Sequence, residues 1–462
     1  MAAATHYNAI IIGAGQGGGP LSTALAKAGR RTALIEQDQV GGTCINYGCT
    51  PTKTMVASAR VAWLARRGAD YGVQTGPIAV DQTVVRERKR KIVESFRAGS
   101  EKRIESAKGL DLIRGSATFT GPRNLRVTCV DGSEQELAAD LIFIDTGTRN
   151  STPNIDGLAD VPYLDSTSIM ELDETPDHLI VLGGGYIGLE FAQMFRRFGS
   201  AVTVIQRGSH LLAREDDDIA DAMRQILEED GIDIRLNAEA SSVRKTNDGV
   251  EVTVSSKSGD HAINGSHLLV AIGRAPNTDD LNLSAAGVET NEKGFVTVNE
   301  RLETNVPGIY ALGDVNSGPQ FTHISYDDFR VIRDNLLKGG NRSTHDRQVP
   351  YCVFTDPELG RIGLTERQAR EQGRKIRVAK MKMSSVARAR EMDETRGLMK
   401  VLVDRETDLI LGGAILGVWG GEIMTQLQLA MMGKLTCRDL SDAVFAHPTL
   451  GESLNNLLSS LS

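Results

Sequence analysis

The chain has 462 residues and a net charge of -8. Its composition, with 40% hydrophobic and 24% charged residues, excludes disordered and fibrous proteins. The acidic balance excludes an extended nucleic-acid surface, which needs a basic excess, and no apolar run reaches the roughly 20 residues of a membrane helix. At about 150 residues per domain, the length predicts three domains. Because the chain has only five cysteines and no basic N-terminal segment, we expect no signal peptide, and a cytoplasmic protein without nucleic-acid or membrane partners.

The first predicted element is a strand over residues 7–12, followed by a glycine-rich turn, a helix to residue 29 and a strand ending at Glu36. The turn has the Gly-x-Gly-x-x-Gly pattern at Gly13, Gly15 and Gly18. The first glycine permits the tight turn, the second lets backbone N–H groups approach a pyrophosphate, and the third allows close helix–strand packing. With an acidic residue at the second strand's end to bind a ribose, this βαβ unit predicts a dinucleotide site.

A cysteine pair follows at Cys44 and Cys49, within the segment GGTCINYGCTPTK of residues 41–53. In a regular helix, residues five apart are separated by about 7.5 Å along the axis, whereas a disulfide needs Cα atoms within roughly 7 Å. A bridge would therefore require a distorted turn, which Gly48 can supply. The spacing is wrong for a zinc site, so we predict no metal, and two unreactive core cysteines remain the alternative.

The residues between the cysteine pair and residue 179 predict two long helices over 54–108, broken at 72–77, and then short strands ending at residues 141–144, before Thr146 and Gly147. A second βαβ unit begins at residue 179 and repeats the spacing of the first. Its turn places glycines at Gly183, Gly185 and Gly188, and its second strand ends at Gln206, followed by Arg207. A neutral Gln206 beside a cationic residue would not repel a 2′-phosphate. The unit therefore predicts NADPH, with NADH as the alternative.

These elements predict an α/β fold with two Rossmann-like dinucleotide-binding domains and a C-terminal α+β domain. Residues 398–403 predict a strand in that last domain. We expect the first domain to comprise residues 1–150 and 273–342, the second residues 151–272, and the C-terminal domain residues 343–462.

The motifs together make the chain resemble the class I pyridine nucleotide-disulfide oxidoreductases, the group of glutathione reductase, lipoamide dehydrogenase and mercuric reductase. The resemblance covers essentially the whole chain. It rests on both glycine turns, GGTCINYGCTPTK, Thr146-Gly147, GGGYIGLE (183–190), AIGRAPNT (271–278), Ala311-Leu312-Gly313-Asp314, Phe354-Thr355-Asp356-Pro357-Glu358, and His447-Pro448-Thr449 with Glu452.

The resemblance implies that the first domain holds FAD and the second NADPH or NADH. The implied FAD-binding residues are Gly13, Gly15, Gly18, Glu36, Gly42, Thr43, Thr146, Gly147, Gly313 and Asp314. The implied NAD(P)-binding residues are Gly183, Gly185, Gly188, Gln206, Arg207, Gly273 and Arg274.

The resemblance also implies the catalytic residues. Cys49 would lie over the flavin and Cys44 would attack the substrate, while Lys53 and Glu190 would pair near the flavin. His447, oriented by Glu452, would serve the active site of the other subunit. The C-terminal domain would thus form a homodimer with shared active sites.

The expected activity is transfer of electrons from NAD(P)H through FAD and the Cys44–Cys49 disulfide to a small disulfide or related oxidant. The sequence lacks the C-terminal cysteine pair with which mercuric reductases deliver Hg(II), and Gln206 departs from the acidic residue of NAD-linked lipoamide dehydrogenases. A metal or oxidant reductase, a lipoamide dehydrogenase of a multienzyme complex and a flavin redox sensor remain the alternatives.

Overall fold

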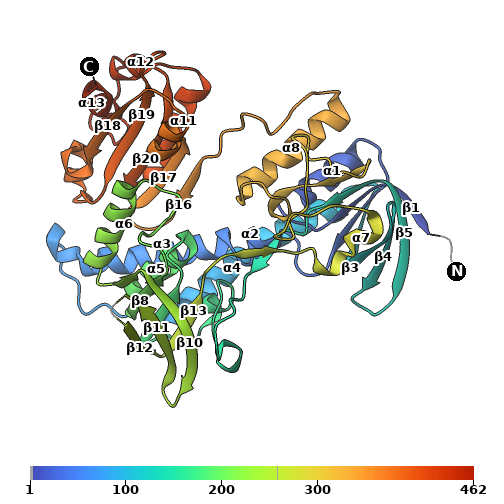
Figure 1. Ribbon diagram of the computed structural model, residues 1–462, viewed down its shortest axis with the longest axis horizontal. Coiled ribbons are helices and arrows are strands. Elements are labelled where there is room, and N and C mark those ends of the chain that lie inside the picture. Colours follow the sequence, from blue (N-terminus) through green and yellow to red (C-terminus); the bar gives the residue numbers. More distant parts are fainter. Residues whose placement is uncertain (1–3, 258, 462) are drawn as a thin grey trace. The chain divides into compact units, whose positions relative to one another are not determined.

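The computed structural model describes residues 4–257 and 259–461, which divide into two compact units (Figure 1). Unit 1 comprises the residues up to Thr54 together with Arg86–Ser151 and Gly273–Arg347. Unit 2 comprises Met55–Val85, Thr152–Ile272 and the residues from Gln348 onward. The division falls within the helices α3 (Cys49–Arg66) and α4 (Gln82–Glu105). These two helices, separated by a short 3-10 helix over Gly68–Tyr71, are the helical pair expected from the sequence.

Unit 1 is built on a sheet of β1, β2, β3, β4, β5 and β15. Four pairs of neighbouring strands are parallel: β1 with β2, β1 with β5, β2 with β3, and β5 with β15. The strand β4 pairs antiparallel with both β3 and β5. The bounds are β1 Thr5–Ile12, β2 Thr32–Glu36, β3 Leu110–Gly121, β4 Asn124–Cys129, β5 Glu134–Ile144 and β15 Ile309–Ala311.

The central strand β1 is apolar because both of its faces are covered. Ile10 and Ile12 belong to one hydrophobic cluster of unit 1, and Ile11 belongs to another that includes residues of α1 (Gly18–Lys27) and α8 (Thr322–Lys338). Parallel strands buried on both faces show such continuous apolar runs. Unit 1 also contains α2 (Gly42–Asn46), α7 (Leu283–Ala286) and the antiparallel pair β6 (Thr148–Asn150) and β14 (Arg274–Pro276).

Unit 2 contains the second parallel sheet, in the order β13, β7, β8, β9. Its strands are β7 His178–Leu182, β8 Ala201–Gln206, β9 Asp233–Leu236 and β13 His267–Val270, with helices α5 Tyr186–Phe198 and α6 Asp217–Glu229. A three-stranded antiparallel sheet of β10 Ala238–Thr246, β11 Gly249–Ser256 and β12 Gly259–Gly265 accompanies it. The βαβ order predicted for residues 179–206 is therefore confirmed.

The C-terminal part of unit 2 is a five-stranded antiparallel sheet in the order β16, β17, β20, β19, β18. α11 packs on β17 and β20, where Gly360 and Gly420 let the helix and sheet backbones approach closely. The bounds are β16 Tyr351–Val353, β17 Glu358–Gly363, α9 Glu366–Glu371, β18 Ile376–Lys382, α10 Ala387–Glu391, β19 Leu398–Asp404, β20 Ile410–Gly417, α11 Gly420–Met432, α12 Cys437–Ser441 and α13 Ser453–Ser459.

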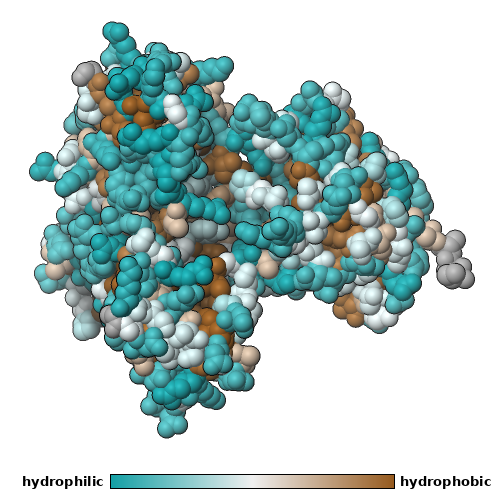
Figure 2. All heavy atoms as spheres, viewed as in Figure 1, coloured by the Kyte–Doolittle hydropathy of each residue, from teal (hydrophilic) through white to brown (hydrophobic). Residues whose placement is uncertain are grey.

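The surface visible in Figure 2 is mostly hydrophilic, with hydrophobic residues in small separate groups. Within residues 4–257 and 259–461, no helix has both the length and the apolar composition that crossing a bilayer requires.

Candidate functional site

The glycine turn before α1 closes on the end of β5. Gly13 has a φ of +105°, and a Cβ there would lie 2.3 Å from the carbonyl oxygen of Asp145. Gly18 donates its backbone N–H to Oδ2 of Asp145 at 2.6 Å, and a Cβ on Gly15 would lie 2.9 Å from the same oxygen. Only glycine fits these positions. Asp145 was not among the predicted site residues, although its place at a strand end directly before Thr146-Gly147 was an available signal.

Glu36 stands at the end of β2, where the predicted ribose ligand was expected. Its Oε2 accepts a hydrogen bond from the backbone N–H of Ala14 at 2.8 Å, and its Oε1 accepts one from Asp38 at 2.8 Å. Burial raises the pKa of Glu36 above its ordinary value despite these two donors. The carboxyl group is thus held rigidly against the glycine turn.

Three carboxyl groups gather in unit 1, of which those of Asp145 and Asp328 are buried and that of Asp314 is half-buried. Burial raises the pKa of each, and the charges of Asp314 and Asp328 raise that of Asp145 further. Gly313 links the group, because its N–H donates to Asp328 at 2.9 Å and a Cβ on it would lie 2.8 Å from Asp145. Crowded carboxyl groups need hydrogen-bond donors, which the hydroxyl groups of a ribose and a ribityl chain would supply. The residues therefore fit FAD.

The remaining predicted flavin residues lie in the same unit. A Cβ on Gly42 would lie 2.9 Å from Cα of Gly15, so the start of α2, with Thr43, meets the glycine turn of α1. Thr146 donates its hydroxyl to the carbonyl of Asn277 at 2.8 Å, and Gly147 has a φ of +65°.

The cysteine pair lies at a break between two helices. α2 ends at Asn46, Tyr47 leaves the helical conformation with a φ of -135°, and α3 begins at Cys49. Nδ2 of Asn46 donates to the carbonyl oxygens of Val40 at 3.0 Å and Gly42 at 3.1 Å, which holds the turn. The distorted turn expected from the spacing is present.

A side-chain hydrogen bond joins Cys44 to Cys49 and, together with burial, raises the pKa of Cys44. The Sγ of Cys49 also lies 3.2 Å from Oγ1 of Thr322, a contact that no local sequence pattern indicates. Cys44 is half-buried and Cys49 is exposed, so the alternative of two core cysteines is wrong.

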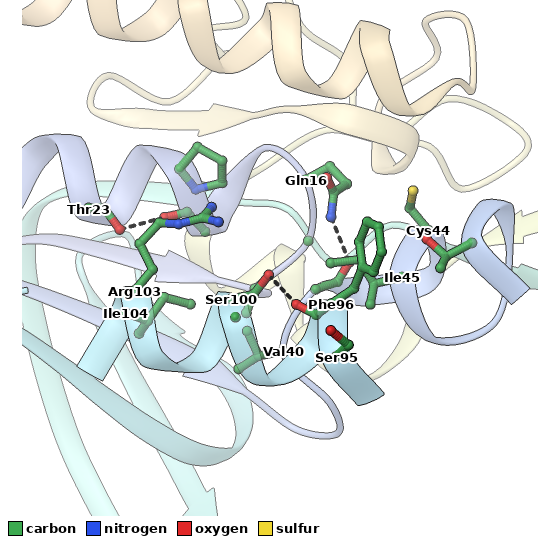
Figure 3. A pocket seen from close by; sticks show the side chains of 17 residues that line it. Gln16, Thr23, Val40, Cys44, Ile45, Ser95, Phe96, Ser100, Arg103 and Ile104 are labelled. Atoms are coloured by element: carbon green, nitrogen blue, oxygen red, sulfur yellow. Dashed lines mark hydrogen bonds between the residues drawn. The ribbon is translucent and has the colours of Figure 1, made fainter. Parts of the chain in front are cut away.

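A cavity of about 480 Å³ lies beside Cys44 within unit 1 (Figure 3). It is bordered by α1, α4 and the start of α2, and it was not foreseen from the sequence. Its lining comprises Ala14, Gly15, Gln16, Gly19, Pro20, Thr23, Val40, Gly41, Cys44, Ile45, Thr50, Ser95, Phe96, Gly99, Ser100, Arg103 and Ile104. This volume suits a small ligand.

The glycine turn before α5 repeats the geometry of the first. A Cβ on Gly183 would lie 2.4 Å from the carbonyl oxygen of Ala271, and one on Gly188 would lie 2.1 Å from the carbonyl oxygen of Gly183. Oε1 of Gln206 accepts the N–H of Gly184 at 2.9 Å, as Glu36 accepts that of Ala14. No atom lies within 4 Å of a Cβ on Gly185, which leaves open space at the turn.

Two predicted cationic residues are already engaged. Arg207 is 81% exposed and lies 3.5 Å from Glu239. Arg274, which follows Gly273, donates to the hydroxyl of Thr148 at 2.7 Å and to the side chain of Asn150 at 3.2 Å.

Lys53 and Glu190 belong to different units. Glu190 is buried on α5, and its Oε1 accepts the backbone N–H of Phe354 at 2.8 Å. Their pairing stays a prediction.

His447 and Glu452 lie together in unit 2. Nδ1 of His447 is 2.9 Å from both carboxylate oxygens of Glu452. Because an ionised carboxylate only accepts, Nδ1 carries the proton and Nε2 is left as the acceptor. The His447 side chain is 67% exposed, so this nitrogen is accessible.

Comparison with protein families and curated proteins extends these observations. The family model described as pyridine nucleotide-disulphide oxidoreductase matches residues 7–328, and the model of that family's dimerisation domain matches residues 349–458. The chain is 42% identical to the probable pyridine nucleotide-disulfide oxidoreductase RclA of Escherichia coli (strain K12), over 98% of this chain and 99% of that protein. It is 35% identical to a mercuric reductase of Streptomyces lividans, over 98% of this chain and 96% of that protein.

Solved structures give the same result. The structure described as the HOCl-induced flavoprotein disulfide reductase RclA from Escherichia coli superposes with a TM-score of 0.90 and 41% sequence identity, covering 99% of this chain and 100% of that one. A structure described as the Cu(II) complex of the same reductase matches equally well, with a TM-score of 0.90.

Proposed function

This chain belongs to the pyridine nucleotide-disulphide oxidoreductase family and is therefore an FAD-dependent oxidoreductase that uses NAD(P)H; we propose that Cys44 and Cys49 are its redox pair and that its acceptor is a small disulfide. The hydrogen-bonded cysteine pair at the α2–α3 junction, beside a cavity of about 480 Å³, carries this proposal.

The residues assigned to FAD are those around the first glycine turn and the carboxyl cluster: Gly13, Gly15, Gly18, Glu36, Gly42, Thr43, Thr146, Gly147, Gly313 and Asp314, to which we add Asp145. Bound FAD supplies the two-electron chemistry between nicotinamide and thiols. The protein's part is to hold a polar cofactor against glycine backbone and carboxyl groups.

In the proposed reaction, Cys44 is the attacking thiol. The hydrogen bond to Cys49 and burial raise its pKa, so a base must take its proton before it attacks. The Cys44 thiolate attacks one sulfur of the acceptor, the acceptor's S–S bond breaks, and the released thiolate takes up the proton. The Cys49 thiolate then attacks the sulfur of Cys44, which forms the Cys44–Cys49 disulfide and releases the second thiolate, and this thiolate takes up a proton from solvent. The sum consumes NAD(P)H, a proton and a disulfide and yields NAD(P)⁺ and two thiols.

We assign the proton transfer to Nε2 of His447, which Glu452 orients, and we propose that it acts in the other subunit of a homodimer. The matched dimerisation domain supports the assembly, and Leu429, Met432 and Leu435 expose apolar side chains at the end of α11 and just beyond it. Burying such residues between subunits would stabilise a dimer. We further propose that Lys53 pairs with Glu190 near the bound flavin.

For the nucleotide, we propose NADPH in preference to NADH, bound by Gly183, Gly185, Gly188, Gln206, Arg207, Gly273 and Arg274. Neutral Gln206 occupies the place where Glu36 stands in the first unit and would not repel a 2′-phosphate. We place the protein in the cytoplasm, where NAD(P)H is available as reductant.

A thiophilic metal ion is the second candidate acceptor. The similarity to mercuric reductases and to a reductase solved as a Cu(II) complex favours it, because paired thiolates are ligands for soft ions. A lipoamide dehydrogenase role has support from relatives named dihydrolipoyl dehydrogenase, which are 34% and 32% identical to this chain. A flavin redox sensor without a turnover substrate is the remaining alternative.

The test compares purified wild-type flavoprotein with Cys44→Ser and, as a control, Cys129→Ser, whose thiol lies on β4. NADPH should bleach the flavin absorbance of all three. NADPH oxidation with lipoamide, glutathione disulfide or an aromatic disulfide should be lost in Cys44→Ser alone. Wild-type turnover by Cys44→Ser would contradict the dithiol mechanism. Turnover of Hg(II) or Cu(II) but of no disulfide would favour the metal reductase, and turnover of no acceptor the sensor.

A further inference from the structure

The cavity beside Cys44 has one charged side chain in its described lining, that of Arg103. Polar groups of Gln16, Thr23 and Ser100 and the ring of Phe96 make up much of the rest. The one charge of the described lining is thus positive, in a protein whose net charge is -8.

The cation lies at the opposite end of the cavity from the thiol. Figure 3 shows Cys44 at one end of the lining and Arg103 at the other, with Phe96 between them. Phe96 and Arg103 are seven residues apart on α4, which corresponds to about 10 Å along the helix axis. A ligand that reaches both ends must therefore be elongated.

The charge of Arg103 is available to a ligand. Within the part of the chain that the structure describes, its guanidinium forms no ion pair. Two neighbouring acidic residues of α4 are occupied elsewhere, because Glu94 pairs with Arg97 and Glu101 pairs with Arg114. A guanidinium is well suited to hold a carboxylate through two parallel hydrogen bonds.

The cavity also has free space along its length. A Cβ on Gly19 of α1 would meet no atom closer than 3.7 Å, and none lies within 4 Å of a Cβ on Gly99 of α4. Glycine at these two helix positions leaves a passage between the helices that larger side chains would narrow.

We propose that Arg103 is a specificity-determining residue that selects disulfides with a carboxylate at the end remote from the sulfur atoms. This inference rests on the proposed function, since it assumes that the acceptor meets Cys44 in this cavity. The acceptor class is then a small, elongated, anionic disulfide, with its sulfur at Cys44 and its carboxylate at Arg103.

The first experiment compares lipoate with lipoamide. Both have the same disulfide ring and methylene chain, but lipoate ends in a carboxylate and lipoamide in a neutral amide. Wild-type enzyme should reduce lipoate with the lower KM. Arg103→Gln should raise the KM for lipoate by about fivefold, the upper range for an exposed ion pair, and leave that for lipoamide unchanged. Arg103→Lys should retain most of the preference.

The matched control is Lys102→Gln, which removes the same charge from the adjacent, exposed position of α4 that does not line the cavity. An equal effect of both variants would show a general charge effect and overturn the proposal. An equal KM for the two substrates in the wild type would also overturn it. Loss of FAD from Arg103→Gln would assign the arginine to the cofactor instead.

A second measurement does not depend on turnover. In the NADPH-reduced enzyme, octanoate should slow alkylation of Cys44 by iodoacetamide, whereas octanamide should not, and Arg103→Gln should abolish the protection. If no disulfide is reduced but octanoate still protects, the proposed disulfide reductase function fails while the anion site stands. If disulfides are reduced but octanoate gives no protection and lipoate no preference, the site fails alone.

Discussion

His447 holds its Nδ1 2.9 Å from both carboxylate oxygens of Glu452, which fixes the imidazole with its Nε2 directed away from that carboxylate. The two residues are five apart in the sequence and lie in the same unit, so the turn between them sets the geometry. A carboxylate in this position also stabilises the imidazolium that forms when Nε2 takes a proton.

The first prediction concerns this pair. His447→Gln should lower kcat for disulfide reduction by about 10²- to 10⁴-fold, the usual contribution of a general acid–base. Glu452→Gln should cost less, about tenfold, because the amide oxygen can still accept from Nδ1 but carries no charge. NADPH oxidation by a quinone, which needs no thiol protonation, should stay at the wild-type rate in both variants. A parallel loss of quinone reduction would indicate a structural role.

The second prediction concerns nucleotide choice. Gln206→Glu places a carboxylate where the neutral amide now accepts the N–H of Gly184. The new charge should repel a 2′-phosphate and bind a ribose hydroxyl, so the ratio of kcat/KM for NADPH over NADH should fall about tenfold. Arg207→Gln should lower the same ratio, because Arg207 is the exposed cation next to it. An unchanged ratio in both variants, or a strong NADH preference in the wild type, would contradict the NADPH assignment.

The third prediction concerns stability in unit 2. Asp356 accepts hydrogen bonds from Arg60 and, at 2.5 Å, from Arg197, and both guanidinium groups lower its pKa although burial alone would raise it. Asp356→Asn removes the nearer carboxylate of both cations and leaves Arg60 with Glu394 and Arg197 with Asp230, so it should cost about 3 kcal/mol of unfolding free energy near pH 7, the lower end for a broken buried pair.

The pH dependence of that cost follows from the lowered pKa of Asp356. The stabilisation is present above the unfolded carboxyl pKa of about 4 and is lost as the pH falls through the lower folded pKa. The difference between wild type and Asp356→Asn in chemical denaturation should therefore shrink below about pH 4. Asp393→Asn, which removes an exposed carboxylate that pairs with Arg67, should cost less than about 1 kcal/mol at any pH. A pH-independent difference for Asp356→Asn would show that charge is not its source.

The fourth prediction separates stability from activity. Gly99→Leu should stabilise the protein by about 0.5–1 kcal/mol, because glycine is unfavourable within a helix and no atom lies within 4 Å of its Cβ position. The leucine side chain would fill the cavity beside Cys44, so kcat/KM for a bulky disulfide should fall about tenfold while quinone reduction is retained. Ala98→Leu, at a neighbouring position outside the lining, is the control. A rise in Tm without any loss of disulfide turnover would place the acceptor elsewhere.

Local patterns in the sequence predicted much of the fold. Both glycine turns, the helices α3 and α4, and the distorted turn between Cys44 and Cys49 depend on residues near one another in the chain. The equal spacing of the two turns anticipated their common geometry, in which Glu36 and Gln206 each accept a backbone N–H. The family was identifiable for the same reason, since its motifs are short and contiguous.

What the sequence by itself determined was therefore the kind of unit each segment forms and the family to which the chain belongs. Only the tertiary structure brought Asp145 to Gly18 across 127 residues, Thr322 to Cys49, and Arg103 to the cavity that contains Cys44. Backbone turns and helix breaks follow from the conformational preferences of neighbouring residues. Cavities and contacts between distant residues depend on side chains that meet only when separate strands and helices pack, so local patterns do not predict them.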